Sequence, residues 1–232
     1  MWWLAIPPAV ALGAYVVKKI FEEDDVNYKL TTPQQSLLEC NLKELERIIK
    51  NETNHSKIAI LGQPGAGKST LLSIITDNQC TPRPIIGQQT DATKWNTKYF
   101  SGFFNTYKSY KFVDAPGYDT IQHPIESYLY YFPFGYFDLI FLLLKDKIHA
   151  SDEKIFNCMK FKLGSSISRK LILVKSFSDY LSDNDKHEIK EEFDRKFELS
   201  DKNIKFLFLS NRYRYGINDI KSIVFSLENC NK

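Results

Sequence analysis

Residues 62–69 combine three glycines, a lysine and a serine at a spacing that suits phosphate binding. They read Gly-Gln-Pro-Gly-Ala-Gly-Lys-Ser, which fits the pattern GxxxxGK[ST]. In such a loop successive main-chain N–H groups point inward and form a concave site for an anion. Lys68 adds a positive charge for the β- and γ-phosphates, and the Ser69 hydroxyl is a ligand for Mg²⁺. The sequence predicts that the polyphosphate of a nucleotide is bound by Gly62, Gln63, Pro64, Gly65, Ala66, Gly67, Lys68, Ser69 and Thr70.

A second motif follows about 45 residues further along the chain. The predicted strand 110–113 is followed by Asp114-Ala-Pro-Gly117. After a phosphate loop, an aspartate at the end of a strand holds Mg²⁺ through a water, and the glycine N–H bonds the γ-phosphate. We therefore expect Asp114 to be a metal ligand and Gly117 to contact the reacting phosphate. The alternative is that Asp114 ends an ordinary strand.

A threonine between the two motifs completes the metal site that these patterns predict. Thr90 is the first choice and Thr93 the second, and either could instead be a residue at the edge of a strand. The expected Mg²⁺ ligands are thus Ser69, Thr90 and Asp114. Lys68, Thr90 and Gly117 are the residues we expect to act on the γ-phosphate.

The base-reading motif of a GTPase, [NT]KxD, is altered in this chain. Ser176-Phe177-Ser178-Asp179 follows the apolar stretch 171–174, and Asp179 is placed to accept hydrogen bonds from the guanine N1 and N2 donors. Phe177 replaces the lysine, and it could stack on a purine or pack in the core. After the stretch 206–209, Ser210 and Asn211 are expected to bring a main-chain amide to the guanine O6. The base site is predicted to comprise Ser176, Asp179, Ser210 and Asn211.

Apolar strands alternate with amphipathic helices from residue 57 onward, which is typical of a mostly parallel sheet with helices on both faces. We therefore predict an α/β fold, the three-layer P-loop NTPase of the Ras-like type. Two of the strands, 94–100 and 110–113, are expected to form a hairpin around Ser101-Gly102. A helix from Pro33 precedes this domain. The predicted divisions are 1–20, an anchor; 21–32, a linker; 33–56, the preceding helix; and 57–232, the nucleotide-binding domain.

The N-terminus carries an uncharged segment, Trp2 to Val17, which is followed by Lys18 and Lys19. Its length is at the lower limit for a membrane-spanning helix, and tryptophans and lysines are usual at the two interfaces. The sequence thus predicts a single N-terminal membrane anchor with the domain facing the cytoplasm. Because prolines 7 and 8 weaken a straight helix, an amphipathic or buried terminal helix is the alternative.

Composition excludes several other classes of protein. The net charge of +3 and the absence of a basic block argue against a nucleic-acid partner. The four cysteines lie far apart and form no CxxC pair, which disfavours zinc binding and redox catalysis.

Read together, these motifs resemble the interferon-inducible immunity-related GTPases. The likeness rests on Asp114-Ala-Pro-Gly-Tyr118, on residues 173–176 with Asp179, and on residues 208–211. It implies Mg²⁺ with GTP or GDP as ligand, slow turnover and a homodimer formed across the nucleotide face. Tyr118 stands where Ras-like enzymes carry a water-orienting glutamine, which also favours weak intrinsic hydrolysis. The alternatives are a P-loop ATPase, because Phe177 breaks the guanine code, and a catalytically weak pseudo-GTPase that acts as an interaction module.

Overall fold

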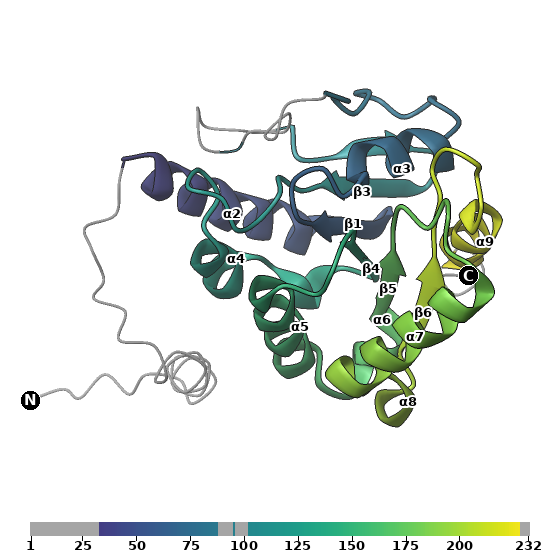
Figure 1. The fold of residues 1–232 in the computed structure, drawn as a ribbon. Helices are drawn as coiled ribbons and strands as arrows, with labels where there is room; N and C mark the ends of the chain where they lie inside the picture. Colours follow the sequence, from purple (N-terminus) through teal and green to yellow (C-terminus); the bar gives the residue numbers. More distant parts are fainter. Residues whose placement is uncertain (1–32, 88–94, 96–101, 228–232) are drawn as a thin grey trace, which may run out of the picture.

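A mostly parallel β-sheet forms the middle layer of the fold. The computed structural model describes residues 33–87, 95 and 102–227 (Figure 1). Within them the strand order is β2-β3-β1-β4-β5-β6, and β2 alone pairs antiparallel to its neighbour. The strands are β1 (Ser56–Gly62), β2 (Asn105–Tyr107), β3 (Tyr110–Asp114), β4 (Leu139–Leu144), β5 (Leu171–Lys175) and β6 (Lys205–Phe208).

Helices cover both faces of the sheet (Figure 1). The helical segments are α2 (Pro33–Asn51), α3 (Lys68–Ile75), α4 (Ile125–Tyr131), η1 (Phe134–Tyr136), α5 (Ala150–Leu163), η2 (Gly164–Ser166), α6 (Ile167–Lys170), α7 (Asp183–Phe197), α8 (Leu199–Lys202) and α9 (Ile217–Ser226).

Alternate residues of each strand belong to two separate hydrophobic cores. In β1, Ala59 and Leu61 pack with α2, α4, α5 and α7, whereas Ile58 and Ile60 pack with α3 and α9. All six residues of β4 are buried, as expected for a parallel strand covered on both faces. The predicted three-layer α/β fold is confirmed.

Helix α2 is an integral part of the larger core. Leu38, Leu42, Leu45 and Ile49 recur every three or four residues, so they lie on one face of the helix, and all four are fully buried. That face packs against α4 and η1. The helix that precedes the phosphate loop therefore covers one side of the same sheet.

The predicted hairpin around Ser101-Gly102 is wrong. β3 pairs with β2, and the turn between them is Lys108-Ser109, where Lys108 has a φ of 53°. A tight two-residue turn needs positive φ, which usually selects glycine or asparagine. Lys108-Ser109 contains neither residue, so the sequence did not mark it as a turn, and Ser101-Gly102 was chosen instead because it contains a glycine. Residues 94 and 96–100 lie outside the described residues.

Helix α4 was not predicted, because its aromatic sequence lacks a clear polar face. It begins after Pro124, and it buries Ile125, Tyr128 and Leu129 against the core. Tyr128 stacks on Phe132 with ring centroids 5.7 Å apart. Contacts with α2 and α5, rather than helix propensity, stabilise this short segment.

The predicted anchor, 1–20, and linker, 21–32, lie outside the described residues. Among the helices that the structure does describe, none combines the length and the apolar character needed to cross a membrane.

Glu52 joins the end of α2 to the sheet. Its carboxylate accepts hydrogen bonds from the Asn54 N–H at 2.9 Å, from His55 Nδ1 at 3.0 Å and from the Lys111 ammonium. Desolvation raises the pKa of Glu52, but the bonds with Lys111, His55 and Asn54 outweigh it and lower the pKa to about 2. The charged form of Glu52 is therefore stabilised by folding.

We predict that Leu42→Ala lowers the free energy of unfolding by about 2–5 kcal/mol, because it leaves a cavity in a packed core. Urea unfolding followed by circular dichroism measures this change. Lys50→Ala, at an exposed position of the same helix, serves as the control and should change it by less than about 0.5 kcal/mol. Equal stabilities of the two variants would show that α2 does not contribute to the core.

We predict that Glu52→Gln lowers stability at pH 7 by on the order of 1–3 kcal/mol. A carboxylate with a depressed pKa stabilises the fold above its unfolded pKa of 4.5, and that contribution is lost as pH falls to about 2. The difference between wild type and variant should therefore vanish near pH 2. Urea unfolding at pH 7, 4 and 2.5 measures it, with Glu44→Gln at the exposed Glu44–Arg47 pair as the control. A difference that does not depend on pH would contradict the proposed role of the charge.

Candidate nucleotide-binding site

The phosphate loop connects β1 to α3 at the carboxyl edge of the parallel sheet. A Cβ added to Gly62 would lie 2.4 Å from the Leu143 carbonyl oxygen of β4, so the loop begins in close main-chain contact with that strand. Gly67 precedes α3 with a φ of 86°, a conformation that glycine adopts without strain. The Leu71 N–H then bonds the Gly67 carbonyl at 2.8 Å and starts the helix. The first turn of α3 thus points its N–H groups toward the loop, as anion binding requires.

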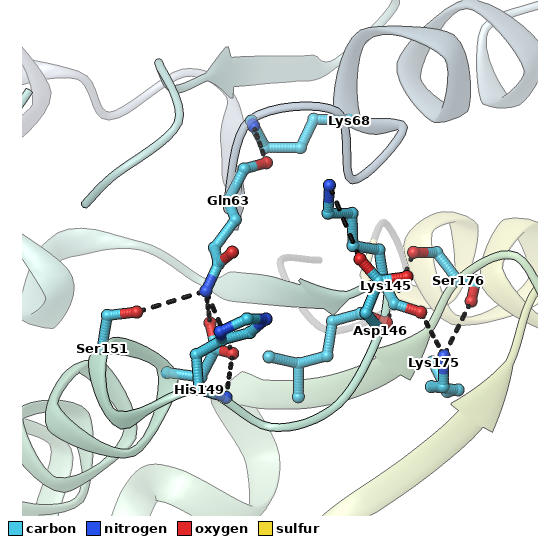
Figure 2. A network of polar contacts seen from close by, with 10 residues as sticks. Gln63, Lys68, Lys145, Asp146, His149, Ser151, Lys175 and Ser176 are labelled. Carbon is cyan, nitrogen blue, oxygen red and sulfur yellow. Dashed lines mark hydrogen bonds and ion pairs between the residues drawn. The ribbon is translucent and has the colours of Figure 1, made fainter. Parts of the chain in front are cut away.

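Lys68 folds back over its own loop. Its ammonium group donates hydrogen bonds to the carbonyl oxygens of Gly62 and Gln63, each at 3.0 Å. Figure 2 shows the bond to Gln63. Lys68 is buried, with 8% of its surface exposed. A buried positive charge is therefore fixed at the inner side of the loop, together with the main-chain amides.

Ser69 and Asp114 meet beside this charge. The Ser69 hydroxyl donates a hydrogen bond of 2.5 Å to Asp114 Oδ2. Asp114 Oδ1 is buried and has no hydrogen-bond partner within the described part of the chain. Burial raises the pKa of Asp114, while the Ser69 hydroxyl and the Lys68 charge oppose that rise. A hydroxyl and a carboxylate with an unused buried oxygen suit a hard divalent cation, so these two residues fit Mg²⁺.

Gly117 packs directly on the phosphate loop. A Cβ at this position would lie 2.4 Å from Pro64 N, so only glycine allows the two segments to approach this closely. Tyr128 holds the preceding residue by donating a hydrogen bond of 2.8 Å to the Pro116 carbonyl. The main chain of Gly117 is thereby placed against the residues that surround the expected phosphates.

Tyr118, the next residue, lies in the core instead of the site. It is fully buried, and its hydroxyl donates a hydrogen bond of 2.7 Å to Asp152 Oδ1 of α5. Burial raises the pKa of Tyr118 well above its ordinary value, and the charge of Asp152 adds to the effect. Its hydroxyl is engaged by Asp152, and that carboxylate in turn links it to Gln63 of the phosphate loop.

Asp152 connects the two motifs and was not identified from the sequence. Its carboxylate accepts hydrogen bonds from Tyr118 and from the Gln63 amide, which lies 3.3 Å from both oxygens and 3.2 Å from the Ser151 hydroxyl. Figure 2 shows Gln63 reaching from the phosphate loop to the start of α5. The His149 N–H also bonds Asp152 Oδ2, at 2.9 Å. An aspartate three residues after the N-cap residue His149 could have been recognised from the sequence as a helix-capping residue. That pattern does not predict the contacts of Asp152 with Gln63 and Tyr118.

Thr90 and Thr93 lie outside the described residues. Trp95, the described residue that follows Thr93 in the chain, is buried, and its carbonyl accepts a hydrogen bond of 2.6 Å from Asn41 of α2. The choice between the two threonines therefore stays a prediction.

The segments after β5 and β6 meet at the predicted base site. The Ser210 hydroxyl donates a hydrogen bond of 2.6 Å to Asp179 Oδ1, and the Ser178 N–H bonds the Leu209 carbonyl at 3.0 Å. Ser176 is buried, and both its N–H and its hydroxyl bond the Leu144 carbonyl of β4, at 2.9 and 3.3 Å. The Ser176 side chain therefore supports the loop rather than facing a ligand.

A pocket of about 470 Å³ lies between these segments and the phosphate loop. Its size suits a purine nucleoside. Asn211 reaches across to the loop with a hydrogen bond of 3.2 Å from Nδ2 to the Gly67 carbonyl. Phe177 is 56% exposed with a φ of 55°, so of its two alternatives, stacking on a purine or packing in the core, the second is wrong. The lining residues are Gly67, Thr70, Phe177, Asp179, Tyr180, Asn211 and Arg212.

Solved structures of P-loop GTPases share this fold. An Era variant from Aquifex aeolicus bound to GDP·AlF4⁻ is 15% identical over 75% of this chain and 57% of its own, with a TM-score of 0.53. Era in complex with MgGDPNP and a segment of 16S ribosomal RNA is 16% identical, with the same coverage and a TM-score of 0.51. A bacterial selenocysteine-specific elongation factor is 17% identical over 77% of this chain and 29% of its own, with a TM-score of 0.50. The chain thus spans little more than half the length of the Era chains.

No curated protein sequence matches the chain. A family model, 50S ribosome-binding GTPase, matches residues 57–175, which is about half of the 232 residues. The match includes β1, the phosphate loop and the segment 114–117, whose geometry is described above. The chain therefore belongs to the 50S ribosome-binding GTPase family and contains a P-loop GTPase domain.

Proposed function

We propose that this chain binds Mg-GTP and hydrolyses it slowly to GDP and phosphate, acting as a nucleotide-dependent switch. The observation that carries the proposal is the buried ammonium of Lys68, held within hydrogen-bond distance of the Gly62 and Gln63 carbonyls. Main-chain amides, one fixed positive charge and the adjacent Ser69–Asp114 pair are the groups that a triphosphate requires.

Binding follows from the shape and charge of the loop. Residues 62–69 supply N–H groups directed at the phosphates, and the N-terminus of α3 adds its dipole. Lys68 exchanges its bonds with the loop carbonyls for bonds with the β- and γ-phosphate oxygens. Ser69 and Asp114, with Thr90, would hold Mg²⁺, which offsets the negative charge of the phosphates when bound.

Hydrolysis requires a water in line with the γ-phosphate and stabilisation of the charge that develops there. Lys68 and the Gly117 N–H are the groups on this chain that we expect to supply that stabilisation. The Tyr118 hydroxyl donates its hydrogen bond to Asp152, so it is not free to donate one to a water at the phosphate. We therefore expect slow intrinsic hydrolysis of GTP. If the rate were close to zero, the chain would be a catalytically weak pseudo-GTPase that still binds the nucleotide.

Asp179 gives the base site its preference for guanine. The Ser210 hydroxyl bonds Asp179 Oδ1, and Oδ2 is the oxygen that would accept hydrogen bonds from the guanine N1 and N2 donors. The exposed ring of Phe177 offers a stacking surface of a kind that every purine can use. Because stacking does not distinguish guanine from adenine, ATP is the nucleotide that would compete with GTP for this site.

We propose three finer features on the strength of the sequence. The uncharged segment within residues 1–20 anchors the chain to a membrane, with the GTPase domain facing the cytoplasm. The likeness to immunity-related GTPases in residues 114–118 and 173–179 supports switching by self-association. A homodimer across the nucleotide face would then complete the catalytic site.

We predict that Lys68→Ala abolishes nucleotide binding and raises the Kd for GTP at least about 100-fold, because it removes a buried charge that faces the phosphates. Titration of the protein with a fluorescent GTP analogue measures the affinity. Lys50→Ala on the exposed face of α2 is the control and should bind as the wild type does. Full affinity in Lys68→Ala would refute the assignment of the phosphate loop.

We predict that the wild type prefers GTP to ATP by about tenfold or more, and that Asp179→Asn reverses its preference toward xanthosine triphosphate. An asparagine amide donates a hydrogen bond to the xanthine O2, whereas it faces the guanine N2 donor with a donor of its own. Competition titrations with the three nucleotides measure the change, and Asp183→Asn on the exposed first turn of α7 is the control. An unchanged preference in Asp179→Asn would place the base elsewhere.

A further inference from the structure

Lys145 brings a second ammonium group to the phosphate loop from a different strand. It follows directly after β4, and Figure 2 shows its side chain extending toward the loop that carries Lys68. A Cβ added to Gly65 would lie 3.7 Å from Lys145 Nζ, so the ammonium group lies where a side chain at position 65 would meet it, with room for about one methyl group between them. None of the sequence motifs includes this lysine.

The main chain of Lys145 is tied to the base-reading segment. Its carbonyl accepts a hydrogen bond from the Lys175 ammonium, and the Ser176 N–H bonds the neighbouring Leu144 carbonyl at 2.9 Å. These contacts fix the base of the side chain between the segment 175–179 and the phosphate loop. The main chain that carries the Lys145 side chain is therefore held by the segment that would bind the base.

The charge of Lys145 is only weakly compensated by the protein. Its ion-pair partner is Asp146, whose Oδ2 lies 3.6 Å away and whose side chain is 66% exposed. A long, solvated pair of this kind contributes little energy and does not compete strongly with a polyphosphate. Residues 176–179 contain no cation, because Phe177 takes the place where the base-reading motif carries a lysine.

We propose that Lys145 binds the α- and β-phosphates of the nucleotide and so supplies from β4 the cation that residues 176–179 lack. This proposal rests on the proposed function, since it requires a guanine nucleotide in the same site. Along the loop, Gly65 lies between Gln63, which contacts the Lys68 ammonium, and Gly67, which lines the base pocket. Lys145 therefore approaches the phosphates on the side of the base, and its charge acts on GDP and GTP alike.

The test compares Lys145→Met, which keeps the aliphatic stem, with Lys145→Gln, Lys145→Arg and the control Lys147→Met at an exposed position of the same loop. Affinities of the full chain for GDP, GTP and guanosine are measured by calorimetry at two salt concentrations. We expect Kd values for GDP and GTP about tenfold higher in the Met and Gln variants, with a weaker salt dependence. Lys145→Arg should stay within about threefold of the wild type, and guanosine affinity should not change.

Two results would overturn the proposal while leaving the proposed function intact. One is a GDP affinity in both neutral variants within about twofold of the wild type, measured alongside a loss of binding in Lys68→Ala. The other is a loss confined to GTP, which would assign the charge to the γ-phosphate. If the wild type itself bound no guanine nucleotide, the proposed function would fail together with the role of Lys145.

Discussion

Contacts that leave no room for a methyl group hold the phosphate loop in its place. A Cβ would lie 2.7 Å or less from a neighbouring atom at each of three glycines, namely Gly62 against β4, Gly67 against Asn211 and Gly117 against Pro64. The loop is thereby fixed against β4 itself and against the segments that follow β3 and β6. Lys68, Ser69 and Asp114 keep their mutual arrangement because these three contacts set the distance between the segments that carry them.

Most of the sheet could be predicted from the sequence, because parallel strands buried on both faces appear as continuous apolar runs. The hairpin failed since the turn at Lys108-Ser109 carries none of the residues that usually mark positive φ. Helix α4 was missed for a related reason, as its residues are held by contacts with α2 and α5 that no local pattern records. Local sequence thus predicted the buried strands, and tertiary contacts decided the rest.

The site divides in the same way. The phosphate loop and Asp114 follow fixed spacings that chemistry demands, so their proximity could be foreseen. Asp152 and Lys145 belong to no motif, and they reach the site only because β4 and α5 lie beside the loop. At Phe177 the sequence left stacking and core packing both open, and the exposed fraction of the side chain excludes core packing.

The burial of Tyr118 determines where a signal from the nucleotide can travel. Gly117 is joined covalently to a phenol that is enclosed in the core and bonded to the first turn of α5. A large swing of Gly117 would pull that ring out of its packing, which is energetically costly. Small displacements of Gly117 would instead reach α5 through the hydrogen bond between Tyr118 and Asp152. The state of the γ-phosphate would then be read as strain along one helix on the flank of the domain, rather than as the unfolding of a surface loop.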